Sequence, residues 1–119
     1  EKYEKDISMK AIILAAGMGK RLQNFSGGLP KSMIEIGGQS IIHRQIESCL
    51  AVGIKKFVFV LGFKKNILQD HILRKLKTEN CSFVFNPVFD RTNTLYSLWL
   101  ARKYFDDDFI YFNADVIFK

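Results

Sequence analysis

Four short apolar runs recur along the chain, each closed by a residue that favours turns. They show little alternation of polar and apolar positions, which is typical of strands buried on both faces of a sheet. The predicted strands cover residues 9–15, 57–61, 82–85 and 109–112. The segments between them carry apolar residues at helical spacing, which predicts three helices. The helical positions are Ile42, Ile46, Cys49 and Leu50, then Leu68, Ile72 and Leu76, then Leu95, Leu98 and Trp99.

Strands that alternate with helices at this spacing indicate βαβ units and a parallel sheet. Right-handed crossovers place helices on both faces, so the predicted fold class is α/β, a doubly wound parallel sheet. Ser40 is expected to cap the first helix and Gly53 to end it, and Thr92 or Asn93 to cap the third.

The two ends of the chain also carry expectations. Residues 1–8 are charged and precede Met9, which resembles a natural start, so we expect an extension, tag or linker there and one domain over residues 9–119. The chain stops soon after the fourth strand. An uncovered last strand leaves an open sheet edge, so we expect either the first part of a larger domain or self-association through that strand.

Composition narrows the class of protein. Of the 119 residues, 48% are apolar, enough for a core, and no run reaches the roughly 18 residues that span a membrane. The net charge is +6, but the basic residues are spread out rather than gathered into a block. This spread argues against nucleic acid and favours a small polyanion as partner. The two cysteines, Cys49 and Cys81, have no zinc-site spacing, so we expect free thiols and a reducing cytoplasm.

The loop after the first strand carries the clearest chemistry. Its glycines, Gly17 and Gly19, let the backbone turn sharply and bring N–H groups close to a ligand. Lys20, Arg21 and Lys31 add three cations, which suits a triphosphate. The spacing fits neither the Walker loop nor the dinucleotide fingerprint, because Arg21 and Leu22 stand where those motifs need other residues.

Asp115 follows the fourth strand at the same edge of the sheet as this loop. If the first and fourth strands are neighbours, that edge is the switch point at which doubly wound sheets bind ligands. A carboxylate there suits Mg²⁺, which proteins hold through one or two carboxylates plus substrate phosphates. The sequence therefore predicts Asp115 as a Mg²⁺ ligand; the alternative is a residue that only ends the strand.

Two segments resemble a known family. Residues 11–22, AIILAAGMGKRL, together with Leu29-Pro30-Lys31, resemble the signature of the nucleotidylyltransferases that make sugar nucleotides and CDP-alcohols. The likeness runs from Met9 to about Phe118. Residues 93–99, NTLYSLW, resemble the branch that includes bacterial phosphocholine cytidylyltransferases. The resemblance implies a three-layer, Rossmann-like sheet of the nucleotide-diphospho-sugar transferase type, of which this chain is the N-terminal βαβαβαβ portion.

The resemblance also implies a reaction in which a nucleoside triphosphate, CTP first, and a phosphomonoester such as phosphocholine give a nucleotide-linked product and pyrophosphate. By analogy, Arg21 would hold the β- and γ-phosphates and Lys31 would stabilise charge at the reacting phosphate. Asn93 and Ser97 are either base or ribose contacts, or a helix cap and a solvated turn. The remaining implied nucleotide-binding positions are Leu14, Ala15, Ala16, Gly17, Gly19 and Lys20, with Mg²⁺ on Asp115.

This chain departs from the family in two respects. Ala114 stands where members often have glycine, and the family is about twice as long. Its later half supplies a second acidic metal ligand and most of the acceptor pocket, so the chain alone is expected to bind a nucleotide without turning it over. Two alternatives stay open: a sugar-1-phosphate nucleotidylyltransferase that uses UTP or dTTP, and a noncatalytic nucleotide-binding module.

The remaining aromatic and histidine residues receive plainer interpretations. Tyr96 and Trp99 could form a cation–π box for choline, but the helical spacing of Trp99 favours core packing. His43 and His71 lie on predicted helices without nearby partners for acid–base work, so both are expected to be surface or boundary residues.

Overall fold

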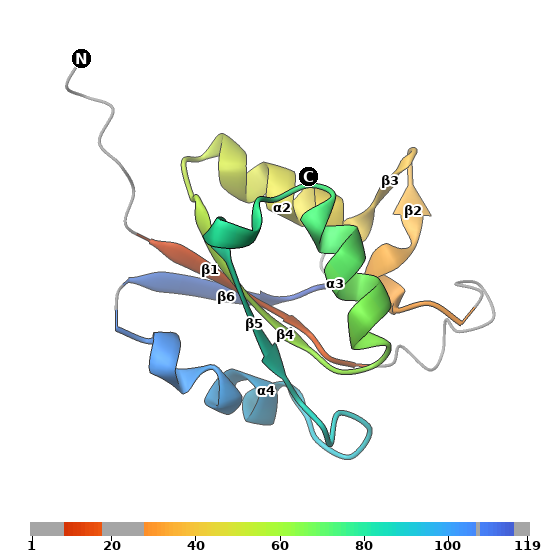
Figure 1. Cartoon of the computed structure of the whole chain (residues 1–119), viewed down its shortest axis with the longest axis vertical. Helices are drawn as coiled ribbons and strands as arrows, with labels where there is room; N and C mark the ends of the chain where they lie inside the picture. The colour runs from red at the N-terminus through yellow and green to blue at the C-terminus, as the bar shows by residue number, and fades with distance from the viewer. Residues whose placement is uncertain (1–8, 18–27, 107, 116–119) are drawn as a thin grey trace.

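The computed structural model describes residues 9–17, 28–106 and 108–115. Its main sheet contains four parallel strands in the order β5-β4-β1-β6. Figure 1 shows the sheet with helices packed on it. The strands are β1 (Lys10–Ala15), β4 (Lys56–Leu61), β5 (Cys81–Phe85) and β6 (Phe109–Asn113), and the helices are α2 (Ile41–Ala51), α3 (Lys65–Leu73) and α4 (Thr94–Leu100), with short 3-10 turns η2 (Lys31–Met33), η3 (Thr78–Asn80) and η4 (Arg102–Tyr104).

The first and fourth predicted strands are neighbours, as the sequence prediction required. β1 pairs with β4 on one side and with β6 on the other, and Leu14 lies opposite Asn113. All six residues of β1 are buried. The near-continuous apolar run at residues 9–15 therefore marks the centre of the sheet, as expected for a strand covered on both faces.

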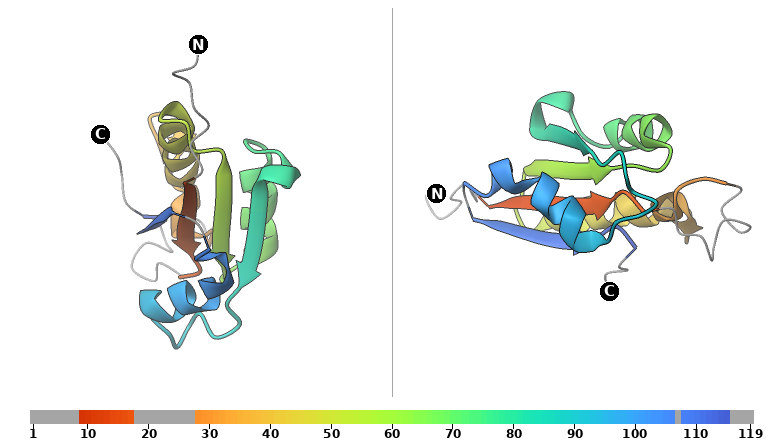
Figure 2. Two further views of the ribbon diagram at one scale, coloured as in Figure 1. Left: turned by 90° about the vertical axis from the view of Figure 1, so that its left-hand side faces the viewer. Right: turned by 90° about the horizontal axis from the view of Figure 1, so that it is seen from below.

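The helices cover both faces because the chain reverses direction across the sheet. From β1 it moves outward through β4 to β5, and α2 and α3 join these strands on one face. It then returns to the other side of β1, so the right-handed connection through α4 lies on the opposite face (Figure 2). Alternate residues of β1 face the two cores: Ile13 packs with the α2 and α3 side, and Ile12 with the α4 side.

A small antiparallel hairpin, which periodicity did not predict, precedes α2. β2 (Glu35–Ile36) pairs with β3 (Gln39–Ser40). Its turn residues Gly37 and Gly38 have φ values of +65° and +85°, a conformation that glycine adopts without strain. Gly-Gly between two short segments is a hairpin signal, but strands of two residues have no detectable period.

The helix caps largely follow the sequence. Ser40 Oγ accepts the backbone N–H of His43 at the start of α2, and Asn93 Oδ1 accepts the N–H of Tyr96 at the start of α4. Asn93, rather than Thr92, is therefore the cap of α4.

The predicted core role of Trp99 is wrong. Trp99 is 51% exposed and Leu95 is 70% exposed, so of the three apolar positions only Leu98 packs against the core. The indole face is covered by the Arg102 guanidinium, 3.7 Å from the ring centroid. Neither Trp99 nor Tyr96 lines the cavity described below, so the structure places no choline-binding aromatic box there.

His43 and His71 are half-buried boundary residues, as expected, but the two rings contact each other, which the sequence did not predict. Their rings stack with centroids 3.8 Å apart, across α2 and α3. His43 Nε2 lies 2.7 Å from the carbonyl oxygen of His71, and His71 Nε2 lies 2.7 Å from Ser40 Oγ. Burial, with smaller contributions from His43 and Arg74, lowers the pKa of His71 to about 4. The pair thus joins two helices that cover the same face of the sheet.

Both cysteines lie in the described part of the chain and are free thiols, as expected. Burial raises the pKa of Cys49 and of Cys81 to about 11, so neither is a reactive thiolate near neutral pH. Among the described residues, no helix has the length and apolar character needed to cross a membrane.

Candidate active site

A cavity of about 340 Å³ opens at the carboxyl ends of β1 and β6. The chain changes direction across the sheet between these two strands, which is where doubly wound sheets hold their ligands. Residues just after β1, β5 and β6, the start of α4, and η2 form its walls. The predicted site edge is therefore a real concavity.

The structure brings together every predicted site residue that it describes. These residues all line the cavity: Leu14, Ala15, Ala16, Gly17, Lys31, Asn93, Ser97 and Asp115. The other three predicted residues, Gly19, Lys20 and Arg21, lie outside the described residues, so their roles stay predictions.

One end of the cavity is charged. Lys31 Nζ lies 3.0 Å from Asp115 Oδ2, and the two side chains are 35% and 42% exposed. Lys31 comes from η2, whereas Asp115 follows β6, where the N–H of Ala114 donates to the carbonyl oxygen of Leu14. Alanine at 114 thus supports a backbone bond to β1. A cation and a carboxylate, both accessible, are suited to a phosphate and its counterion.

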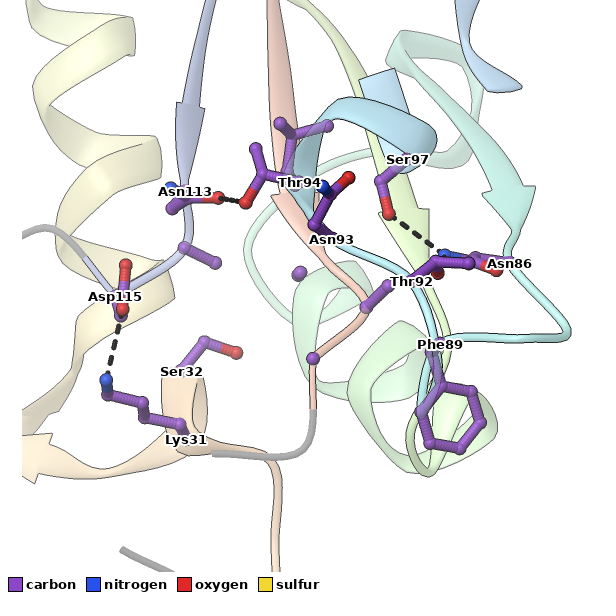
Figure 3. A pocket seen from close by; sticks show the side chains of 15 residues that line it. Lys31, Ser32, Asn86, Phe89, Thr92, Asn93, Thr94, Ser97, Asn113 and Asp115 are labelled. Atoms are coloured by element: carbon purple, nitrogen blue, oxygen red, sulfur yellow. Dashed lines mark hydrogen bonds and ion pairs between the residues drawn. The ribbon is translucent and has the colours of Figure 1, made fainter. Parts of the chain in front are cut away.

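The opposite end is neutral and rich in hydrogen bonds (Figure 3). Asn86 is buried there and its Nδ2 donates to Thr92 Oγ1 and to Ser97 Oγ, each at 3.1 Å. Ser97 is buried on the first turns of α4. Groups of this kind can recognise the edge of an uncharged polar ring, which complements the charged end.

The cap of α4 limits what Asn93 can do. Asn93 Oδ1 already accepts the N–H of Tyr96, so the unused groups of this side chain are its amide N–H donors and the second lone pair of the oxygen. Thr94 donates to Asn113 Oδ1 at 3.1 Å, which ties α4 to β6 across the cavity. Gln45 on α2 donates to the carbonyl oxygen of Asn113, so both core faces support the end of β6.

Gly17 and Gly62, near the cavity, differ in how much space a side chain would find beside them. Within the described ranges, a Cβ at Gly17 would meet nothing within 4 Å, so its backbone is open to a ligand. A Cβ at Gly62 would lie 2.6 Å from Phe89 Cβ and 2.8 Å from the carbonyl oxygen of Ala16. Gly62 therefore permits the close packing of Phe89, which forms part of the cavity wall.

Sequence reasoning missed several cavity residues. Asn86 and Asn113 directly follow or end strands at the carboxyl edge, and this position was the available signal. Phe89 and Thr92 lie in the loop after β5, Ser32 lies in the short turn η2, and Thr94 is the first residue of α4, so none of these is identified by periodicity. The cavity residues outside the predicted site are Ser32, Asn86, Phe89, Thr92, Thr94, Asn113 and Ala114.

The metal-binding groups in the described residues are few. No group of three or more His, Cys, Asp or Glu side chains in the described ranges forms a candidate metal cluster. Asp115 is the one carboxylate among the described residues that line the cavity, which fits a Mg²⁺ ion that arrives with substrate phosphates rather than one held by the protein alone.

Comparison with known proteins agrees with this geometry. A CTP:phosphoglutamine cytidylyltransferase of Campylobacter jejuni is 32% identical over 92% of this chain and 45% of its own length. A UTP–glucose-1-phosphate uridylyltransferase of Haloferax volcanii is 28% identical over 93% of this chain and 45% of its own length. The solved structure of a CTP:phosphocholine cytidylyltransferase from Streptococcus pneumoniae superposes with a TM-score of 0.79 at 30% identity, covering 92% of this chain and 46% of the other.

The chain thus spans about half the length of the curated relatives that it matches. Its sheet and helices match the nucleotide-diphospho-sugar transferase structures, as the resemblance implied. The family model for nucleotidyl transferases matches residues 10–119, which include both cavity strands and the loop after β1. With its cavity at the switch point of a parallel sheet, this chain belongs to the nucleotidyl transferase family.

Proposed function

We propose that the protein containing this chain transfers a nucleotidyl group, CMP from CTP in the first instance, to a small phosphomonoester such as phosphocholine. An oxygen of the acceptor phosphate forms a bond to the α-phosphorus, and the bond from that phosphorus to the bridging oxygen breaks, releasing pyrophosphate. The observation that carries the proposal is the polarity of the cavity, with Lys31 and Asp115 at one end and Asn86 and Ser97 at the other. A nucleotide likewise has charged phosphates at one end and an uncharged base at the other.

Each part of the site then has a distinct task. The backbone from Leu14 to Gly17 meets the base and ribose, and Gly17 allows close approach because no atom of the described residues occupies the space beside it. Lys31 stabilises negative charge at the reacting phosphate, since displacement at phosphorus depends mainly on positioning and charge stabilisation. The proposed roles of Gly19, Lys20 and Arg21 at the phosphates rest on the family resemblance.

Mg²⁺ is part of the proposal. Asp115 would hold the ion together with substrate phosphates, and the ion would neutralise phosphate charge when bound. Asp115 now faces Lys31, and their exposed ion pair is weak enough for a ligand to open.

The choice of CTP and of a phosphocholine-like acceptor rests on two supports. Residues 93–99 resemble the phosphocholine branch, and relatives named for phosphoglutamine and phosphocholine use CTP. The uridylyltransferase relative supports the second candidate, a sugar-1-phosphate nucleotidylyltransferase that uses UTP or dTTP. A noncatalytic nucleotide-binding module is the third candidate, because the chain covers only about half of these enzymes.

We also propose a cytoplasmic site of action. Two free cysteines, one of them fully buried, suit a reducing compartment.

Calorimetric titration with CTP, UTP, dTTP, GTP and ATP, each with and without Mg²⁺, tests the proposal. Selective CTP binding strengthened by Mg²⁺ is the expected result, and tighter binding of UTP or dTTP would favour the sugar-1-phosphate candidate. Pyrophosphate release in an assay with phosphocholine then separates an enzyme from a binding module. Absence of binding to all five nucleotides would contradict the proposal.

A further inference from the structure

The hydrogen bonds of Asn86 fix the orientation of its side-chain amide. Asn86 is 1% exposed, and its Oδ1 lies 3.0 Å from the backbone N of Val88. A backbone N–H can only donate, so the atom facing it must be the amide oxygen. Both hydrogens of Nδ2 are then directed at hydroxyl oxygens, those of Thr92 and Ser97.

The hydroxyl groups of Thr92 and Ser97 differ in whether their proton is still available for a ligand. Each hydroxyl has one proton to donate. Thr92 donates its proton to the carbonyl oxygen of Val88 at 2.9 Å. Ser97 is 4% exposed, lines the cavity, and accepts from Asn86, but within the described ranges no protein acceptor faces its proton. Ser97 therefore presents a hydrogen-bond donor to the cavity (Figure 3).

We propose that Asn86 is a positioning residue that holds Ser97 as a hydrogen-bond donor to the nucleobase of a bound nucleotide. The inference rests on the proposed function. Lys31 and Asp115 lie at the other end of the cavity, which leaves the neutral end for the base. Nucleobases carry ring nitrogens and carbonyl oxygens that accept such a bond, and burial makes an unmet polar group costly.

Asn86 acts through Ser97 rather than on the ligand. Its oxygen and both amide hydrogens are already engaged by Val88, Thr92 and Ser97. Without the amide donor, the Ser97 hydroxyl could turn its proton toward residue 86. The amide thus fixes which partner Ser97 can recognise.

A double-mutant cycle tests the inference, with CTP and inorganic pyrophosphate as calorimetric probes. Ser97→Ala should weaken CTP binding about 3–10-fold, the loss of one neutral hydrogen bond, and leave pyrophosphate binding unchanged. Asn86→Asp keeps the acceptor for Val88 but removes both amide donors, so the Ser97 proton turns to the carboxylate. It should reproduce the loss seen with Ser97→Ala. In the Ser97→Ala background, Asn86→Asp should cause no further loss of CTP affinity.

The controls separate positioning from general damage. Ser48→Ala, on α2 and away from the cavity, is the matched serine variant, and circular dichroism monitors folding. If Asn86→Asp does not fold, Asn86→Ala takes its place in the same cycle. Unchanged CTP binding by Ser97→Ala, additive losses in the double variant, or an equal loss of pyrophosphate binding would overturn the inference alone. If the unsubstituted chain bound neither CTP nor pyrophosphate, the proposed function would be overturned together with the inference.

Discussion

Asp115, which pairs with Lys31 at the charged end of the cavity, is the residue on which the proposed Mg²⁺ chemistry depends. Asp115→Asn removes the carboxylate charge while keeping its shape, so the Mg²⁺ dependence of CTP binding should disappear. The fold should persist, because exposed ion pairs contribute only about 0–1 kcal/mol to stability. Calorimetry with and without Mg²⁺ measures the first effect and thermal unfolding the second. Asp70→Asn, on an exposed position of α3, is the control. Persistent Mg²⁺ dependence would place the metal elsewhere.

Arg21 carries the strongest prediction from the sequence. Arg21→Ala should weaken nucleotide binding by about 1.5–3 kcal/mol, the loss expected when a charged hydrogen-bonding partner is removed. Titration with CTP measures this, and Arg74→Ala, at the end of α3, controls for loss of a positive charge. If both variants bound CTP with equal affinity, Arg21 would not be part of the nucleotide site.

The two glycines at the cavity should separate stability from binding. Gly62→Ala forces a methyl group against Phe89 and the carbonyl oxygen of Ala16, so unfolding free energy should fall by about 1–3 kcal/mol. Gly17→Ala meets no atom of the part of the chain that the structure describes and should leave stability nearly unchanged, yet weaken nucleotide binding because the methyl group occupies space beside the backbone. Urea unfolding and CTP titration of both variants measure this. A Gly17→Ala chain that binds CTP normally would contradict close ligand approach there.

Residue by residue, the sequence was informative where a side chain acts near its own strand end. Gly17 and Asp115 could be placed at the cavity because each closely follows a recognisable strand, whereas Lys31 was placed there by its loop and by the family resemblance. The position of Asn86 after β5 was a signal, but its role could not be predicted, because that role depends on Ser97, eleven positions later, and on which proton each hydroxyl has already donated. Such a network exists only once the loop after β5 has folded.

At the scale of elements, the junction of α2 and α3 should make stability depend on pH. His71 is half-buried, which favours its neutral form, and its pKa falls to about 4 from an ordinary value of 6.5. The unfolded chain therefore binds a proton first as the pH falls, so stability is full above about pH 6.5 and is lost down to about pH 4. The loss should reach about 1–2 kcal/mol, allowing for the partial solvation of this side chain.

Replacing the ring tests this assignment. His71→Gln should flatten the decline in unfolding free energy between pH 6.5 and 4, measured by urea denaturation at several pH values. His43→Gln provides the comparison, since it removes the stacking partner but retains the titrating His71. An unchanged pH profile for His71→Gln would assign the effect to other groups.

The four long strands and three helices followed from periodicity, whereas the β2–β3 hairpin did not, and the exposed side of α4 was misjudged. Strands at the centre of the sheet are buried on both faces, so their apolar runs were unambiguous. In α4, spacing predicted a core stripe, yet Leu95 and Trp99 are exposed. Periodicity reports that apolar residues share one side of a helix, but it does not report whether another element covers that side.

At the scale of the whole molecule, β6 forms one edge of the described sheet. Ile110 is 37% exposed and Tyr111 is 54% exposed on this strand. An open edge with apolar side chains can pair with another copy, so the average mass of the 119-residue chain should rise with concentration in light scattering. Tyr111→Lys should reduce that rise, because charge on an edge strand opposes pairing. A monomeric mass at every concentration would contradict this prediction.

The cavity lies between two strands that are distant in the chain, and this has a consequence for how the fold forms. Leu14 and Asn113 are partners across two adjacent strands although they are far apart in sequence. On the ribosome, β1 must wait until β4, β5 and the helices between them have been made before β6 can join it, and contacts of such long range form slowly. The nucleotide pocket is thus completed only after the other strands of the described sheet. A nucleotide that binds there would favour the finished fold by mass action, so the ligand would act as a late check on synthesis as well as a substrate.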